Sequence, residues 1–199
     1  MGHPAEALQG ESFDELYERI RNLPEGMTGE ILVPNVLKTM SRPGKRHRRS
    51  ALQCLDALRP FNANLSGTGW WIEVEPEVRL PSNRLVVPDL IGYRVERVPE
   101  LPEENPLTIV PDWVCEILSP STEKEDTTIK RPLYARCGIP WIWIVDPAKR
   151  LIEVYETIDS RPALTALAKE DERVVLPPFG QEFDVGPFWL PVPDAPLER

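Results

Sequence analysis

The sequence contains few residues that bind transition metals or form disulfides. Its 199 residues include two histidines, His3 and His47, and three cysteines, Cys54, Cys115 and Cys137. No two of these cysteines have the spacing of a zinc site, and an odd number of them cannot all pair. A histidine-rich zinc centre is therefore not expected, and the cysteines are typical of reduced core thiols in a cytoplasmic protein.

Long apolar runs and an excess of positive charge are also missing. The longest apolar run, residues 141–145, is far shorter than the roughly 20 residues that span a membrane. Residues 1–16 have neither a basic start nor an apolar core, so no secretory signal is expected. With 23 Lys and Arg against 32 Asp and Glu, the net charge of −9 argues against coating nucleic acid by bulk positive charge.

The composition is that of an ordinary soluble protein. Hydrophobic residues make up 41% of the chain and charged residues 28%, and the length predicts a single domain with a real core. Proline is abundant, with 23 residues that gather at segment boundaries and in a C-terminal extension, residues 176–199.

Helical patterns occur twice in the first third of the chain. Ser12 and Glu15 form a capping box, which predicts that a short helix follows, and residues 29–34 suit a short strand. A second helix is predicted from about residue 46 until Pro60 stops it. Its apolar face would consist of Ala51, Leu52, Leu55 and Leu58.

Three strands are predicted next. Residues 70–81 alternate between apolar side chains and Glu73, Glu75 and Glu77, as in a half-exposed strand. Metal ligation by these glutamates is an alternative, but alternation alone explains them. The apolar runs 85–91 and 113–118 predict buried strands. Because no helical pattern connects the three, we expect an antiparallel meander.

The second half adds a helix and a hairpin. Thr122 and Glu125 form another capping box, Gly138 suits a helix end, and Pro132 should kink the helix between them. A buried strand at 141–146 and a hairpin partner at 151–157 follow. The order predicts an α/β fold with a mixed central sheet of about four or five strands, flanked by helices.

Two carboxylates interrupt the apolar strands, Asp89 in "RLVVPDLIGY" and Glu116 in "VPDWVCEILSPST". At a strand end each acid would reach solvent; otherwise it must be paired, protonated or bound to a metal. If the strands pair, the two acids can project at one end of the sheet, where they would repel by roughly 4 kcal/mol at about 4 Å. A divalent cation removes this repulsion, and oxygen ligands suit Mg²⁺ or Mn²⁺, which activate water against phosphodiesters.

These motifs together resemble the PD-(D/E)XK nucleases, and most closely the Uma-type restriction endonuclease family. The resemblance spans residues 24–157 and rests on "GEIL", "RPGKRH", "VPD", "CEILSPST", the Asp126, Lys130 and Tyr134 series, and "GIPWIWIVDP". It implies a PD-(D/E)XK nuclease-like core of order αβββαβ. It also implies metal-dependent hydrolysis of DNA phosphodiester bonds, by a protein that often acts as a homodimer.

The resemblance also implies roles for individual residues. Asp89 and Glu116 would hold the cation, and Glu30 would be a further metal ligand unless it is an exposed strand residue. The family pattern has a lysine where this chain has Leu118, and Lys130 is the replacement catalytic candidate.

The spacing of four residues predicts that Asp126, Lys130 and Tyr134 share a helix face. In the functional interpretation this face points to the metal site, and Asp126 and Tyr134 support the residues that act there. Alternatively, Asp126 and Lys130 form a surface ion pair.

One dense basic cluster stands out in the acidic chain. It consists of Lys45, Arg46, His47, Arg48 and Arg49. These residues are candidates for binding the nucleic-acid backbone, and a solvated helix start is the alternative. Two other functions stay open: a catalytically inactive interaction module with the nuclease fold, which Leu118 favours, and a metal-dependent hydrolase of a smaller phosphoester.

Overall fold

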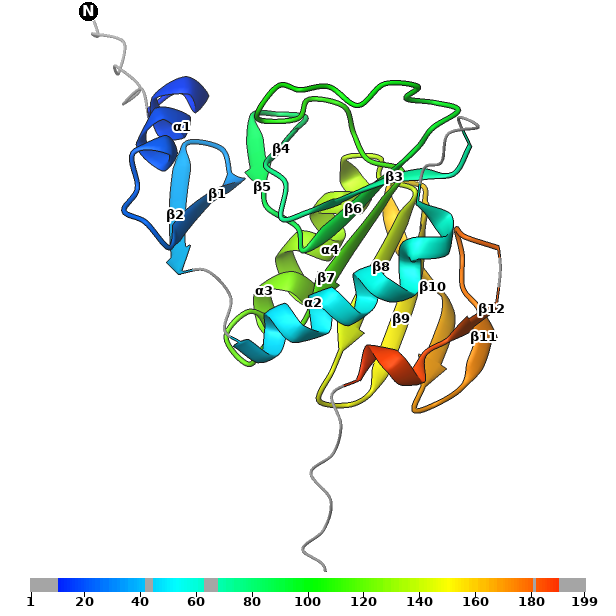
Figure 1. Cartoon of the computed structure of the whole chain (residues 1–199). Coiled ribbons are helices and arrows are strands. Elements are labelled where there is room, and N and C mark those ends of the chain that lie inside the picture. Colours follow the sequence, from blue (N-terminus) through cyan, green and yellow to red (C-terminus); the bar gives the residue numbers. More distant parts are fainter. Residues whose placement is uncertain (1–10, 42–44, 63–67, 181, 190–199) are drawn as a thin grey trace, which may run out of the picture.

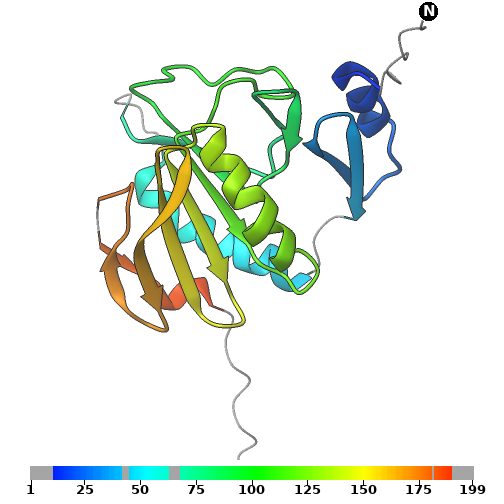
Figure 2. The same ribbon diagram turned by 180° about the vertical axis from the view of Figure 1, so that it is seen from behind.

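The computed structural model describes residues 11–41, 45–62, 68–180 and 182–189 (Figure 1). Most strands belong to two sheets that lie side by side, and helices cover both faces of the larger one (Figures 1 and 2). This is the mixed α/β architecture that the element order predicts. Within the described residues, no helix is long and apolar enough to cross a membrane.

The larger sheet has six strands in the order β10-β9-β8-β7-β6-β3. Their bounds are β3 (Trp70–Val74), β6 (Leu90–Arg94), β7 (Trp113–Ile117), β8 (Trp141–Asp146), β9 (Leu151–Ile158) and β10 (Arg161–Lys169). Strands β7 and β8 are parallel, and the other neighbours are antiparallel. The meander and the final hairpin are confirmed. The sheet is wider than expected because β10 continues the hairpin.

Helices sandwich this sheet. Helix α2 (Lys45–Leu58) and the short η1 (Arg59–Phe61) pack on one face, against a core that includes Trp113 and Trp143. The crossover from β7 to β8 covers the other face, where Tyr134 packs with Ile142 and Ile144. The predicted apolar face of α2 is partly wrong. Cys54 and Leu58 are buried, but Leu52 is 53% exposed.

The smaller sheet has the order β2-β1-β5-β4. It contains β1 (Met27–Val33), β2 (Val36–Ser41), β4 (Val78–Leu80) and β5 (Arg84–Val86). Helix α1 (Phe13–Arg21) packs on it and begins at the predicted capping box, in which Ser12 and Glu15 exchange hydrogen bonds.

Two predicted strands are in fact each divided between the two sheets. The run 70–81 breaks at Glu75, whose φ of +49° leaves the extended region, so β3 and β4 join different sheets. Val74 is consequently exposed rather than part of an apolar face. The run 85–91 breaks at residues 87–89, where Pro88 has no N–H to donate to the hydrogen-bond ladder of a sheet. Asp89 therefore lies where the chain passes from one sheet to the other.

The crossover helix is distorted, as Pro132 predicts. It consists of α3 (Glu123–Glu125), a π-helical turn η2 (Asp126–Lys130) and α4 (Arg131–Arg136). Gly138 follows the last turn with a φ of +83°, which suits glycine. The second capping box is wrong because the Thr122 side chain makes no capping hydrogen bond and Glu125 pairs with Lys38.

Side chains near the C-terminal end of the described chain complete the hydrophobic core. Strands β11 (Arg173–Val175) and β12 (Glu182–Asp184) pair with each other, and η3 (Gly186–Phe188) follows. Phe179, Phe188 and Trp189 are buried in the cluster beneath α2. The described part of the expected C-terminal extension thus packs on the domain, and residues 190–199 lie outside the described residues.

Candidate active site

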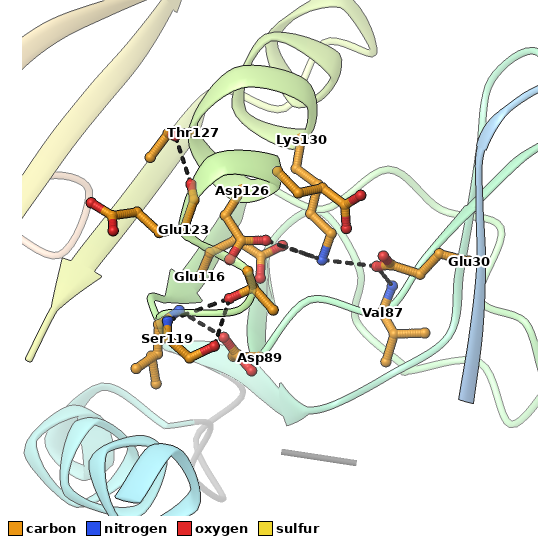
Figure 3. A network of polar contacts seen from close by, with 12 residues as sticks. Glu30, Val87, Asp89, Glu116, Ser119, Glu123, Asp126, Thr127 and Lys130 are labelled. Atoms are coloured by element: carbon orange, nitrogen blue, oxygen red, sulfur yellow. Dashed lines mark hydrogen bonds and ion pairs between the residues drawn. The ribbon is translucent and has the colours of Figure 1, made fainter. Parts of the chain in front are cut away.

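A cavity of about 840 Å³ lies where the two sheets meet. Its lining includes the end of β7, the start of the crossover helix, the β1–β2 hairpin and the first turn of α2. The acidic candidates Asp89, Glu116 and Asp126 all line it, together with Lys130. The structure therefore brings together Asp89 from the β5–β6 connection, Glu116 from β7, and Asp126 and Lys130 from the crossover helix (Figure 3).

Glu116 is held in this cavity by two donors. Lys130 Nζ lies 3.2 Å from Glu116 Oε1, and the Tyr134 hydroxyl donates to the same oxygen. The Glu116 side chain is almost fully buried, and burial raises its pKa well above the ordinary value. Lys130 opposes this rise, whereas neighbouring carboxylates add to it. A further positive charge in the cavity would lower the pKa of Glu116 again.

Lys130 is the centre of a buried charge cluster. Its ammonium lies 2.8 Å from Glu30 Oε1 and 3.6 Å from Asp126 Oδ1, in addition to Glu116 (Figure 3). Burial lowers the pKa of Lys130, but the three carboxylates outweigh it and raise the pKa well above the usual value. Lys130 is therefore a fixed cation.

The alternative of a surface ion pair between Asp126 and Lys130 is wrong, because both side chains are buried. Burial also raises the pKa of Asp126, against the attraction of Lys130.

Glu30 reaches the cluster from the smaller sheet. It is 0% exposed, so the exposed-strand alternative is wrong. Its Oε1 accepts a hydrogen bond of 2.9 Å from the backbone N–H of Val87. Among the described residues, Glu30 Oε2 has no hydrogen-bond partner. A buried carboxylate oxygen without a partner is costly, and it is suited to a cation.

Asp89 is fixed by the backbone and by one side chain. Its Oδ2 accepts a hydrogen bond of 2.6 Å from the N–H of Ile117, next to Glu116 in β7. His47 Nε2 lies 3.1 Å from Asp89 Oδ1. Burial lowers the pKa of His47, but the hydrogen bond and charge of Asp89 outweigh this and raise it.

The basic cluster that contains His47 is divided by the fold. His47 points into the cavity, whereas Arg48 and Arg49 are exposed on α2. The side chains of Lys45 and Arg46 lie outside the described part of the chain. The sequence offered no local signal for the contact of His47 with Asp89, which is 42 residues away. Nucleic-acid binding by the cluster stays a prediction.

A loop with three hydroxyl side chains, residues 119–122, also lines the cavity. The sequence analysis treated this segment only as the start of a helix. Ser119 Oγ lies 3.0 Å from the hydroxyl oxygens of both Ser121 and Thr122, and all three residues line the cavity. Leu118, at the family's lysine position, packs on the apolar cluster behind the sheet. The positive charge beside Glu116 belongs to Lys130, 3.2 Å away.

The donor set determines which cation the cavity can hold. Within the described residues, no group of three or more His, Cys, Asp and Glu side chains is placed to hold a metal ion. Mg²⁺ needs fewer protein ligands than such a group supplies, because it usually keeps several waters and takes one or two carboxylates. The carboxylates of Asp89 and Glu116, with the unpartnered oxygen of Glu30 nearby, fit such a hydrated ion.

Comparisons with known proteins concern the family and the fold of the chain. Residues 13–192 match the model of the Uma2 family, described as "Putative restriction endonuclease". No curated protein matches the chain. A solved structure described as "a putative nuclease belonging to DUF820", from Anabaena variabilis ATCC 29413, superposes with a TM-score of 0.68. The match covers 89% of this chain and 97% of that one at 20% identity, and it shows a shared fold.

Proposed function

The chain belongs to the Uma2 family, described as "Putative restriction endonuclease", and from this premise we propose that it is a metal-dependent endonuclease that hydrolyses DNA phosphodiester bonds. The preferred cation is Mg²⁺ or Mn²⁺, because the candidate ligands are carboxylate oxygens.

The observation that carries the proposal is the surplus of buried carboxylates. Glu30, Asp89, Glu116 and Asp126 lie together with two side chains that can be positive, Lys130 and His47. Even with both of these charged, negative charges outnumber positive ones by two. A single divalent cation would offset this difference, and a core that served packing alone would avoid it.

Each residue has a role that follows from its contacts. Asp89 and Glu116 would hold the cation, and Glu30 with its unpartnered oxygen would come within reach as a further ligand only after its side chain moves toward them. A bound cation would supply a water of lowered pKa and polarise the phosphodiester. The Tyr134 hydroxyl and the Lys130 ammonium orient Glu116. Lys130 also places a fixed positive charge beside the position where negative charge develops on the phosphate.

The experiment that tests the proposal is cleavage of plasmid DNA with Mg²⁺, with Mn²⁺ and with a chelator. We expect cleavage only with a divalent cation. Glu116→Gln keeps the shape and the hydrogen-bonding oxygen but removes the charge, so it should lower the rate by about 100-fold or more. Glu18→Gln, on the exposed face of α1, is the matched control and should cleave normally.

A catalytically inactive interaction module is the second candidate function. Leu118 stands where the family pattern has a lysine, and Lys38 and Lys130 of the cavity lining are both paired with carboxylates. Calorimetry with Mn²⁺ distinguishes the two, because a module without catalysis has no need of a cation. Absence of both cation binding and DNA cleavage would leave the module as the better explanation.

A further inference from the structure

The cavity extends beyond the carboxylates onto the β1–β2 hairpin. Met27, Thr28 and Met40 line this part. In the antiparallel register Thr28 lies opposite Met40, and Glu30 lies opposite Lys38. Because side chains alternate along a strand, Thr28 and Met40 project on the same face as Glu30 and Lys38. The hairpin therefore presents a partly apolar surface about 7 Å, two strand residues, from the charge cluster.

This surface is unsuited to a phosphate. The carboxylates of Glu75 and Glu77 also line the cavity, and Lys38, the nearest cation on the hairpin, pairs with Glu125. A phosphate there would face net negative charge. A nucleobase fits better, because its faces are apolar, its amino groups can donate to carboxylates, and methionine packs well against flat rings.

The depth of the site restricts how a substrate reaches it. Glu116 is 2% exposed and lines the cavity, so a substrate reaches it through the cavity. In a continuous duplex each base is stacked and paired, so a base can lie against the hairpin only after it has been extruded. An unpaired strand can place its phosphate near Asp89 and Glu116 and its base beside the hairpin at no such cost.

Resting on the proposed nuclease function, we propose that Thr28 and Met40 of the β1–β2 hairpin form a subsite for the base of an unpaired nucleotide. The preferred substrate is then single-stranded DNA, or an unpaired stretch within a duplex.

A binding experiment tests the subsite without catalysis. The full chain with Mg²⁺ is titrated in a calorimeter with 2′-deoxycytidine 5′-monophosphate, which has no diester to cleave, and with inorganic phosphate. We expect the nucleotide to bind at least about tenfold more tightly than phosphate. Met40→Ala should remove most of this difference. Val36→Ala, on the same strand but 54% exposed outside the cavity lining, should keep it. Equal affinities for nucleotide and phosphate, or no binding of either at millimolar concentration, would overturn the subsite.

A cleavage experiment tests the substrate class. Oligonucleotides of one sequence are compared as single strand, full duplex and duplex with a short unpaired gap. We expect the single strand and the gap to be cut about tenfold faster than the duplex, and Met40→Ala to raise KM more than it lowers kcat. Equal rates on duplex and single strand would overturn the inference while the nuclease function stands. Nucleotide binding without cleavage of any DNA would support the subsite and refute the nuclease function.

Discussion

Lys130 contacts all three acids of the buried cluster, Glu30, Glu116 and Asp126. It comes from the π-helical turn, and its ammonium contacts Glu30 from one sheet and Glu116 from the other. Removing one partner of a buried ion pair is costly, because the remaining charge stays in a medium that solvates it poorly. Lys130 therefore has a role in stability in addition to any role in chemistry.

Lys130→Met should lower the free energy of unfolding by about 3–5 kcal/mol in the absence of divalent cations. Mn²⁺ should recover part of this loss, because it can neutralise the same carboxylates. Urea unfolding with and without Mn²⁺ measures both effects. Lys124→Met, exposed on the same crossover helix, is the control and should change stability little. A Lys130→Met protein as stable as the parent would show that the cluster is not charged as described.

Removing the Tyr134 hydroxyl tests whether it positions Glu116 for metal binding, rather than whether it stabilises the fold. Tyr134→Phe removes a donor to Glu116 and keeps the buried ring. Loss of a group that orients a ligand typically weakens metal affinity by about 10–100-fold. Calorimetric titration with Mn²⁺ checks this, with Tyr155→Phe as control, since that hydroxyl contacts Arg131 and Glu153 instead. Equal Mn²⁺ affinities in the parent and Tyr134→Phe would mean that Glu116 does not bind the ion.

Sequence reasoning found Asp89 and Glu116 through local signals, and Glu30 and Lys130 through the resemblance to the nuclease family. Asp89 and Glu116 interrupt apolar runs, and Lys130 lies four residues from Asp126. It did not find the contact of His47 with Asp89, because a contact between distant residues leaves no pattern in either segment.

At the scale of elements, periodicity predicted where strands occur but not which sheet they join. The runs 70–81 and 85–91 each have the composition of one strand, yet each supplies a strand to both sheets. Alternation reports that a face is buried and carries no information about the neighbour that buries it. The breaks at Glu75 and Asp89 create the passage between the sheets, so the site lies where the local prediction fails.

The exposed arginines of helix α2 lead to a prediction about DNA affinity. Its first turn carries His47 at the cavity and exposes Arg48 and Arg49 beside it. If these arginines contact phosphates, Arg48→Ala with Arg49→Ala should weaken binding of all sequences alike. The slope of log affinity against log salt is negative, and its magnitude should decrease by about 1 for each lost contact. Fluorescence anisotropy of labelled DNA with Mg²⁺ at several salt concentrations measures this slope. Arg161→Ala, exposed on β10, should leave the slope unchanged, and an unchanged slope in the α2 double variant would remove the basic cluster from the DNA interface.

At the scale of the whole molecule, a cation bound at the proposed site would be a structural partner as well as a chemical one. The chain carries a net charge of −9, and its surplus of buried carboxylates lies where the smaller sheet, the larger sheet and the crossover helix meet. A cation that binds only the folded state stabilises it by RT ln(1 + [L]/Kd), about 2.7 kcal/mol at 100 times Kd. Because the ligands belong to different elements, this energy should oppose separation of the two sheets.

Mn²⁺ should therefore raise the melting temperature of the whole protein, with a dependence on concentration that reports Kd. Scanning calorimetry in Mn²⁺, in chelator and in NaCl of equal ionic strength separates specific binding from screening. The variant with Asp89→Asn and Glu116→Gln should lose the response to Mn²⁺. It should also be no less stable than the parent in chelator, since two repelling charges are gone while the polar contacts remain possible. The same response to NaCl as to Mn²⁺ would mean that screening at the surface is the cause. The carboxylates between the two sheets would then be balanced without a bound ion.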